Sequence, residues 1–441
     1  MSESALSSIA EINPGTRIPL EINGSDEVSF IPMSDVSESG DWITHQTRPL
    51  CSVTAGYTAF EEGDVLVAKI TPCLENGKGA HARRLRNGIG FGSTEFHVLR
   101  AKQGIEPRFV FHLTQSRLFR RAAERQMVGS AGQQRVPRQF FDEFLVRDFS
   151  QGEQRAIAQV LDTLDTTIRE TEALIDKFKS VKQGLLHDLL TRGIDANGQL
   201  RPALKDVPQL YKETSLGWVP REWEVAQLAN LLADFDPAMR SGPFGSALLK
   251  EELVEVGLPL LGIDNVHTER FIAEFKRCVT PEKFQQLSRY AVRPADLMIT
   301  IMGTVGRCCL VPDDLGLALS SKHTWTISLD QNRYSPFLAM LQVNYSPWVA
   351  QHFVRDQQGG TMMAIRSDTL RSLQLPVPPR DEQDAIETRL REVGNCIDAE
   401  TAALEKMKLE KSGLMDDLLT GRVRVTPLLE SMQQAAAPTE A

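Results

Sequence analysis

The chain has 441 residues with 49 basic and 58 acidic side chains, and its formal net charge of −9 argues against indiscriminate nucleic-acid binding if the charge is spread evenly. This length holds two domains of about 150 residues with their connectors. The sequence has no apolar run long enough to cross a membrane, no signal peptide at its polar start and no CxxC pair among its six cysteines, so we expect a cytoplasmic protein without a zinc site or disulfide framework.

Residues 1–152 are expected to form a first globule of mixed α/β (α+β) type, with a core built mainly from strands. The run DVLVAKI at 64–70 is typical of a buried strand, and EFHVLRA at 95–101 of a partly alternating one. A helix is expected at Pro107–Arg125. The second half of this globule is strongly basic, because residues 65–138 carry 14 basic and 4 acidic side chains.

This basic segment supplies the first candidate DNA contacts. One group lies on a predicted hairpin tip at 81–88, a second is the row of arginines on one face of the expected helix, and a third lies in the glycine-rich loop 129–138. Arginine and glutamine commonly read guanine and adenine edges. A solvated loop or a structural turn is the alternative for each group. The candidates are Lys69, Lys78, Arg83, Arg84, Arg86, Arg117, Arg120, Arg121, Arg125, Gln133, Gln134, Arg135 and Arg138.

A long helix is expected next, at 153–191. Its apolar residues recur at spacings of three and four over about five heptads, as in the a/d seam of a coiled coil. At about 1.5 Å per residue the helix would be about 57 Å long. The predicted seam consists of Ile157, Leu161, Leu164, Ile168, Ile175, Phe178, Leu185 and Leu189.

Residues 192–218 are expected to be a linker, and 219–381 a second globule of the same mixed type. DLMITIM at 296–302 and HTWTISL at 323–329 are its expected strands, and a helix is expected at Ser335–Phe353. Residues 276–380 carry 12 basic and 7 acidic side chains, so this globule is basic as well. Its candidate DNA contacts are Ser241, Arg307, Lys322, His323, Thr361 and Arg366.

A second long helix, at 382–420, repeats the first at a constant offset of 229 without a gap, with 16 identities over 39 positions. Such a repeat indicates duplicated structure, and its period is too long for a solenoid. Polar residues interrupt both seams at equivalent places, Thr171 with Glu400 and Lys182 with Lys411. The predicted second seam consists of Ile386, Leu390, Val393, Ile397, Leu404, Met407, Leu414 and Leu418.

The two matching apolar stripes predict that these helices pair with each other, and we expect the pair to be antiparallel because each globule is joined closely to its own helix. The alternative is two ordinary core helices in separate domains. Residues 421–441 are expected to be a disordered tail.

Besides a DNA-binding protein without catalytic activity, two other classes stay open: a DNA-modifying enzyme and a coiled-coil adaptor. A stand-alone DNA-modifying enzyme would need a cofactor loop of the FxGxG kind and an Asn/Asp-Pro-Pro-aromatic motif, and neither appears in the sequence. The sequence also lacks a GxxxxGK[ST] loop, an HExxH helix and any cluster of histidines, so we expect no catalytic residue and no metal site. A coiled-coil adaptor that does not bind DNA would leave the basic segments unexplained.

Several phrases of the sequence resemble the specificity subunit of type I restriction–modification systems. They are LLTRGID at 189–195 followed by GQLR at 198–201, GWVPREWEV at 217–225, SGPFGS at 241–246, and LPVPP at 375–379 before Glu382 and Gln383. The resemblance covers essentially the whole chain up to Val425. The entry to the first helix, FSQG at 149–152, departs from the proline-rich entry of the second.

This resemblance implies two target recognition domains, each reading one half of an asymmetric, bipartite double-stranded DNA target. The helices would set the spacing and dock two methylation subunits, and two restriction subunits would join if the system has them. The complex, not this chain, would methylate adenine N6, with S-adenosylmethionine bound by the methylation subunits and ATP and Mg by the restriction subunits. Half-sites one helical turn apart are about 34–36 Å apart, so domains on a rod of about 57 Å could straddle them.

Overall fold

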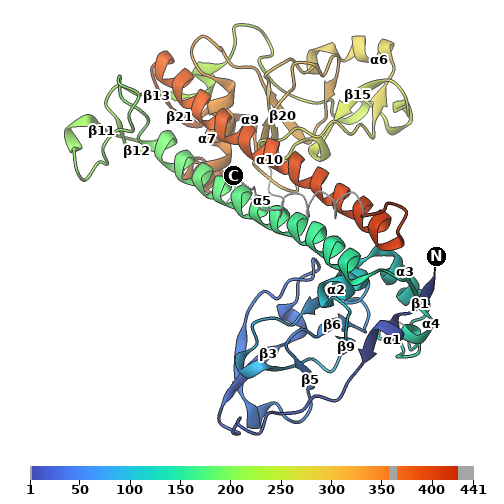
Figure 1. The fold of residues 1–441 in the computed structure, drawn as a ribbon. Coiled ribbons are helices and arrows are strands. Elements are labelled where there is room, and N and C mark those ends of the chain that lie inside the picture. The colour runs from blue at the N-terminus through green and yellow to red at the C-terminus, as the bar shows by residue number, and fades with distance from the viewer. Residues whose placement is uncertain (1, 131, 357–364, 426–441) are drawn as a thin grey trace, which may run out of the picture. The chain divides into compact units, whose positions relative to one another are not determined.

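The computed structural model describes residues 2–130, 132–356 and 365–425, and Figure 1 shows its elements. The chain divides into two compact units. The first unit comprises Met1–Leu174 with Glu400–Ala441, and the second comprises Ile175–Ala399. The long helices α5 (Gln151–Thr191) and α10 (Arg380–Thr420) each contribute one segment to each unit. Among the described residues, no helix is both long and apolar enough to span a bilayer.

The first unit contains two four-stranded sheets and a small strand pair. One sheet has the order β2-β9-β6-β7 and is antiparallel throughout. The other has the order β4-β3-β8-β5, in which β3 and β8 run parallel. The bounds are β2 (Ala10–Ile12), β9 (Phe96–Ala101), β6 (Val65–Ala68), β7 (Gly79–His81), β4 (Gln46–Pro49), β3 (Glu27–Ile31), β8 (Ile89–Gly92), β5 (Thr58–Glu61), and the pair β1 (Glu3–Ala5) with β10 (Leu145–Arg147).

The helix expected at Pro107–Arg125 is wrong as a single helix, because the chain forms α2 (Pro107–Gln115) and α3 (Arg117–Arg125). Ser116 between them is extended, and its hydroxyl accepts a hydrogen bond from the Phe119 amide, which is the usual role of an N-cap serine. The expected helix Ser335–Phe353 is broken in the same way, into α7 (Pro336–Tyr345) and α8 (Pro347–Asp356). Pro347 cannot continue α7 but suits the first turn of a new helix.

The second unit repeats the plan of the first. Its antiparallel sheet has the order β14-β20-β17-β18, and in its other sheet, β16-β15-β19, the strands β15 and β19 run parallel. The bounds are β14 (Met239–Ser241), β20 (Thr324–Ile327), β17 (Leu297–Thr300), β18 (Cys308–Leu310), β16 (Cys278–Val279), β15 (Leu258–Leu261), β19 (Leu319–Ser320), and the pairs β11 (Tyr211–Thr214) with β12 (Gly217–Pro220) and β13 (Glu224–Gln227) with β21 (Gln374–Val377). The remaining helices of the two units are α1 (Leu6–Ile9), α4 (Phe140–Glu143), α6 (Pro281–Gln286) and α9 (Ser367–Arg371).

A buried glutamine fastens each globule to its long helix in the same manner. Gln154 of α5 accepts from the Glu106 amide at 2.9 Å and donates to the Phe149 carbonyl. Gln383 of α10 accepts from the Ser335 amide at 2.8 Å and donates to the Pro378 carbonyl. Both amides are those of N-cap residues, of α2 and α7, so the first helix of each globule begins against its long helix.

The two long helices pair antiparallel, as predicted. In the first unit the beginning of α5 packs with the end of α10, since Ile157 and Leu161 share a core with Leu418. In the second unit the end of α5 packs with the beginning of α10, since Leu189 shares a core with Ile386. All sixteen predicted seam residues are buried or half-buried.

The mixed α/β class and the antiparallel helix pair are thus confirmed, whereas the predicted segment boundaries stay a prediction.

Candidate nucleic-acid interface

One loop of the first unit brings together four of the residues predicted to contact DNA: Lys69, Gln133, Gln134 and Arg135. The chain after β6 runs beside this loop, because the Thr71 amide donates to the Gln134 carbonyl at 3.0 Å and the Val136 amide to the Lys69 carbonyl at 2.8 Å. The loop closes on itself through a bridge between Val128 and Arg135. Its base is therefore held beside the chain that follows β6 by an isolated bridge between Ile70 and Arg135, and the exposed side chain of Gln133 lies beyond that base.

The Arg135 side chain is engaged within the protein. Its Nε and Nη2 atoms each donate to a carboxylate oxygen of Glu95 at 2.9 Å, and Nη1 donates to the Gln133 carbonyl at 3.1 Å. These hydrogen bonds hold the pKa of the Glu95 carboxyl below its usual value. Arg138, three residues further on, is exposed and pairs with Asp142 at 3.0 Å.

A ring nitrogen anchors the base of this loop. Burial lowers the pKa of His97, so the ring is neutral. Nδ1 of His97 then accepts from the side-chain amide nitrogen of Asn13 at 3.1 Å, and Nε2 donates to the Val136 carbonyl at 2.9 Å. In the second unit the indole Nε1 of Trp325 donates to the Ile365 carbonyl at 3.1 Å. His97 and Trp325 hold equivalent places on β9 and β20, opposite Val67 and Ile299. In each unit a ring nitrogen therefore binds the equivalent loop carbonyl, that of Val136 or Ile365.

The arginines of the predicted hairpin tip lie on the turn between β7 and β8. Arg83, Arg84 and Arg86 are all exposed, and Arg84 adopts a positive φ of 56°. Glu62 holds the turn by accepting from the Arg84 and Leu85 amides at 2.7 and 2.8 Å. The guanidinium groups therefore project from a fixed backbone. Lys78, in contrast, is half-buried, and its ammonium group donates to the Met33 carbonyl at 3.2 Å.

The arginines of α3 do not form one surface. Arg117, Arg121 and Arg125 line a cavity of about 390 Å³ with Asp416 and Arg422 from the end of α10. None of the three pairs with an acidic side chain of the described residues, and the lining holds four arginines against one carboxylate, Asp416. Arg120 lies elsewhere, half-buried against Gly77, and burial followed by repulsion from Arg117 lowers the pKa of its guanidinium.

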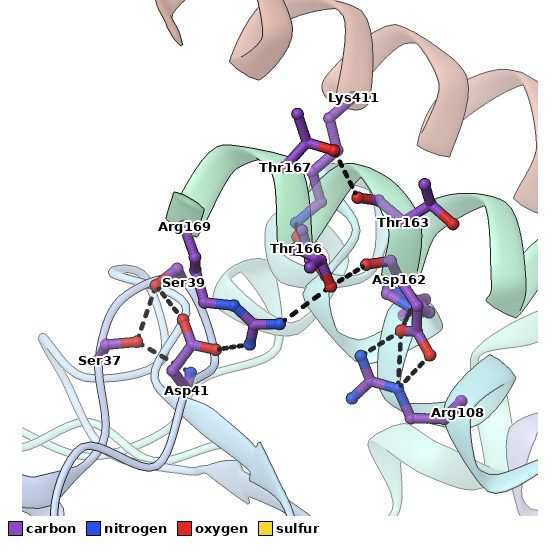
Figure 2. A network of polar contacts seen from close by, with 12 residues as sticks. Ser37, Ser39, Asp41, Arg108, Asp162, Thr163, Thr166, Thr167, Arg169 and Lys411 are labelled. Atoms are coloured by element: carbon purple, nitrogen blue, oxygen red, sulfur yellow. Dashed lines mark hydrogen bonds and ion pairs between the residues drawn. The ribbon is translucent and has the colours of Figure 1, made fainter. Parts of the chain in front are cut away.

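A polar network that the sequence analysis did not single out joins the first globule to the helices (Figure 2). Asp162 of α5 binds the Arg108 guanidinium and accepts a hydrogen bond from Nε2 of the buried His112 at 2.8 Å, since the pKa of its carboxyl is lowered and the group is ionised. Two turns along α5, Arg169 pairs with Asp41 at 2.8 Å. Lys411 of α10 pairs with Asp165.

This network borders a cavity of about 710 Å³, which is also lined by His81, Trp42 and Arg83. His112, Asp162 and Asp165 place ligand atoms within 4.8 Å of one another, but Arg108 and Lys411 already bind the two carboxylates, so we assign no metal to them. The signal in the sequence was the pair of aspartates three residues apart on one long helix.

The candidates of the second unit gather at one end of the sheet β14-β20-β17-β18. The Ser241 hydroxyl lies 3.5 Å from the Lys322 carbonyl, and the Ile301 amide donates to the His323 carbonyl at 3.1 Å. Arg307 closes the turn after β17, where its carbonyl accepts from the Thr300 amide at 2.9 Å. Arg366 is exposed at the N-cap of α9. Thr361 lies outside the described residues.

No protein-family model matches the chain. Over 141 residues it is 44% identical to the type I restriction enzyme EcoAI specificity subunit of Escherichia coli, which covers 32% of this chain and 23% of that protein. Over 281 residues it is 23% identical to the type I restriction enzyme MjaVIII specificity subunit of Methanocaldococcus jannaschii, which covers 63% and 61%. The chain thus spans 23% and 61% of the length of these two relatives.

The fold is shared with a crystal structure of the S subunit of a type I restriction–modification system from M. genitalium. The TM-score is 0.54 at 13% identity, and the match covers 95% of this chain and 96% of that one. The similarity to the two relatives confirms the resemblance to type I specificity subunits that the sequence motifs indicate, and the likeness to the solved structure is one of fold.

Proposed function

We propose that this chain, whose relatives are type I restriction enzyme specificity subunits, is the DNA sequence-recognition subunit of a type I restriction–modification complex. Each globule reads one half of an asymmetric bipartite target, and the paired helices set the spacing between the halves. The observation that carries this proposal is the repeated anchor, His97 on the Val136 carbonyl and Trp325 on the Ile365 carbonyl. Equivalent scaffolds that carry dissimilar loops are suited to reading two different base sequences.

The partners in this proposal are double-stranded DNA and two methylation subunits, one for each copy of the duplicated helix surface. Two restriction subunits join where the system also cleaves DNA. The chain itself binds no cofactor and catalyses no step. S-adenosylmethionine is bound by the methylation subunits, and ATP and Mg by the restriction subunits. The cytoplasm is the expected compartment.

Reconstitution with the methylation subunit from the same genome tests this assignment. Native mass measurement should give two methylation subunits per chain, and only the complex should transfer methyl groups to adenine N6. Binding of the complex to DNA should weaken as salt rises, because phosphate contacts release counterions. A complex with one methylation subunit per chain, or methyl transfer by this chain alone, would contradict the proposal. DNA binding that is absent in the complex would favour the adaptor class instead.

A further inference from the structure

Arg135 has few donors left for a DNA base. A guanidinium carries five N–H groups, and three of them are used by Glu95 and by the Gln133 carbonyl. The edge formed by Nε and Nη2, which suits a bidentate acceptor, is the one that Glu95 occupies. Only one N–H on Nη1 and one on Nη2 are left for a base while the Glu95 pair is intact.

Hydrogen bonds from Arg135 and from Thr71 fix the backbone of the loop at two successive residues. The Gln133 carbonyl is bound by Arg135, and the Gln134 carbonyl by the Thr71 amide. The Gln133 side chain is exposed just beyond this fixed point. A glutamine amide offers a donor and an acceptor, which is the pattern that reads adenine in the major groove.

The ion pair is particular to the first unit. The alignment of His97 with Trp325 places His323 at the position of Glu95, so the second unit has no carboxylate there. The two units therefore share the ring-nitrogen anchor but not the ionic one.

Resting on the proposed function, we propose that Glu95 and Arg135 act together as positioning residues for this loop, and that Gln133 is the side chain of the loop that contacts a base of the first half-site. Arg135 acts through the Gln133 carbonyl rather than on DNA. The acidic Glu95 would repel DNA phosphates if its charge were not balanced, and Arg135 balances it.

Arg135 could contact a base itself or position the loop, and removing its partner Glu95 separates these two roles. DNA binding by the reconstituted complex is measured for the target found by sequencing its methylated sites, and for targets with one base changed in the first half. If Arg135 positions the loop, Glu95→Gln and Arg135→Gln should each reduce the preference for the unchanged target by roughly 10-fold or more. The double variant should be no worse than either single one, because the two residues act as a unit. The reversed pair, Glu95→Arg with Arg135→Glu, should recover part of the preference.

The salt dependence and matched variants complete the test. The Glu95 and Arg135 variants should keep the wild-type salt slope, whereas Arg121→Ala should lower it by about 1 if that arginine contacts a phosphate. Arg333→Gln, which breaks the ion pair with Glu224 in the second unit, should leave the preference unchanged. Gln133→Ala should lose the preference in the first half-site alone.

A Glu95→Gln variant with wild-type or stronger preference would overturn the proposal, because it would show that Arg135 works without its partner. Equal losses in Arg333→Gln would also overturn it. A wild-type complex that does not distinguish DNA sequences would instead contradict the proposed function, and that result does not depend on any variant.

Discussion

Many of the charged residues in this chain are matched to partners inside the fold, and this decides which arginines remain for a polyanion. Arg100 pairs with the buried Asp64, Arg108 with Asp162 and Arg135 with Glu95, over separations of 36, 54 and 40 residues. A sequence reading can locate a basic segment but not these partners, since they lie on other elements. For that reason the exposed Arg83 and Arg84 stand as candidates for phosphate contact, whereas Lys78 and Arg120 are held within the fold.

Acidification should destabilise the first unit through its buried histidines. Burial, followed by the nearby Arg83 and Arg108, lowers the pKa of His81 to about 3. The unfolded chain takes up a proton near pH 6.5, so His81 favours the folded state fully above that pH and progressively less as the pH falls toward 3. Between pH 7.5 and pH 5.5 this group alone should cost about 1 kcal/mol of unfolding free energy.

The comparison is between the wild type and His81→Gln, which cannot titrate. Urea unfolding can be followed by fluorine NMR of 5-fluorotryptophan, because Trp42 is the tryptophan of the first unit and the other four lie in the second. The wild type should lose about 1 kcal/mol more than the variant over this pH range. Equal losses would mean that His81 is already protonated in the folded state at pH 5.5.

At the scale of elements, periodicity predicted the long helices well but not the helix breaks. The seam positions are all buried or half-buried, and their period alone marks the paired face. Leu186, Leu190, Met415 and Leu419 are buried beyond that seam because the globules cover a second face of each helix near its ends. The break between α2 and α3 depends on the Ser116 hydroxyl, which caps α3 by accepting from the Phe119 amide. The spacing of apolar residues does not reveal this break.

The polar seam residue Lys411 should stabilise the first unit through its pair with Asp165. Both side chains are largely buried, at 17% and 16% exposure, so removing one leaves the other poorly solvated. Lys411→Leu should lower the free energy of unfolding by about 1–3 kcal/mol. Adding Asp165→Leu should recover most of this loss, because replacing both members of a buried pair by apolar residues is often neutral.

The second unit supplies the matched control. Lys182 holds the equivalent seam position, but Gly394 stands where a partner aspartate would be, and Lys182 pairs with Glu269 at 2.7 Å instead. Lys182→Leu should destabilise the second unit and leave the Trp42 signal of the first unchanged. An undiminished unfolding free energy in Lys411→Leu would show that its ion pair contributes nothing to the helix pair.

At the scale of the whole molecule, the two units share one scaffold but join its equivalent positions by different pairs of side chains. Where Arg108 meets Asp162 in the first unit, the equivalent Phe337 meets Arg391, with the guanidinium carbon 4.0 Å from the ring centroid. Likewise Asp64 is bound by Arg100 of β9, whereas the equivalent Asp296 is bound by Arg240 of β14. The repeat in the sequence revealed the duplication, but these exchanges of partner became visible only in the fold.

The division of reading between the two globules is the central claim, and exchanging one globule tests it most directly. Residues 219–381 are replaced by the matching domain of a relative with a different target, and the methylated sites of cells that carry the chimera and its methylation subunit are sequenced. The account predicts that one half of the target changes to that of the relative, while the other half and its spacing stay as in the wild type. A change in both halves together would contradict it.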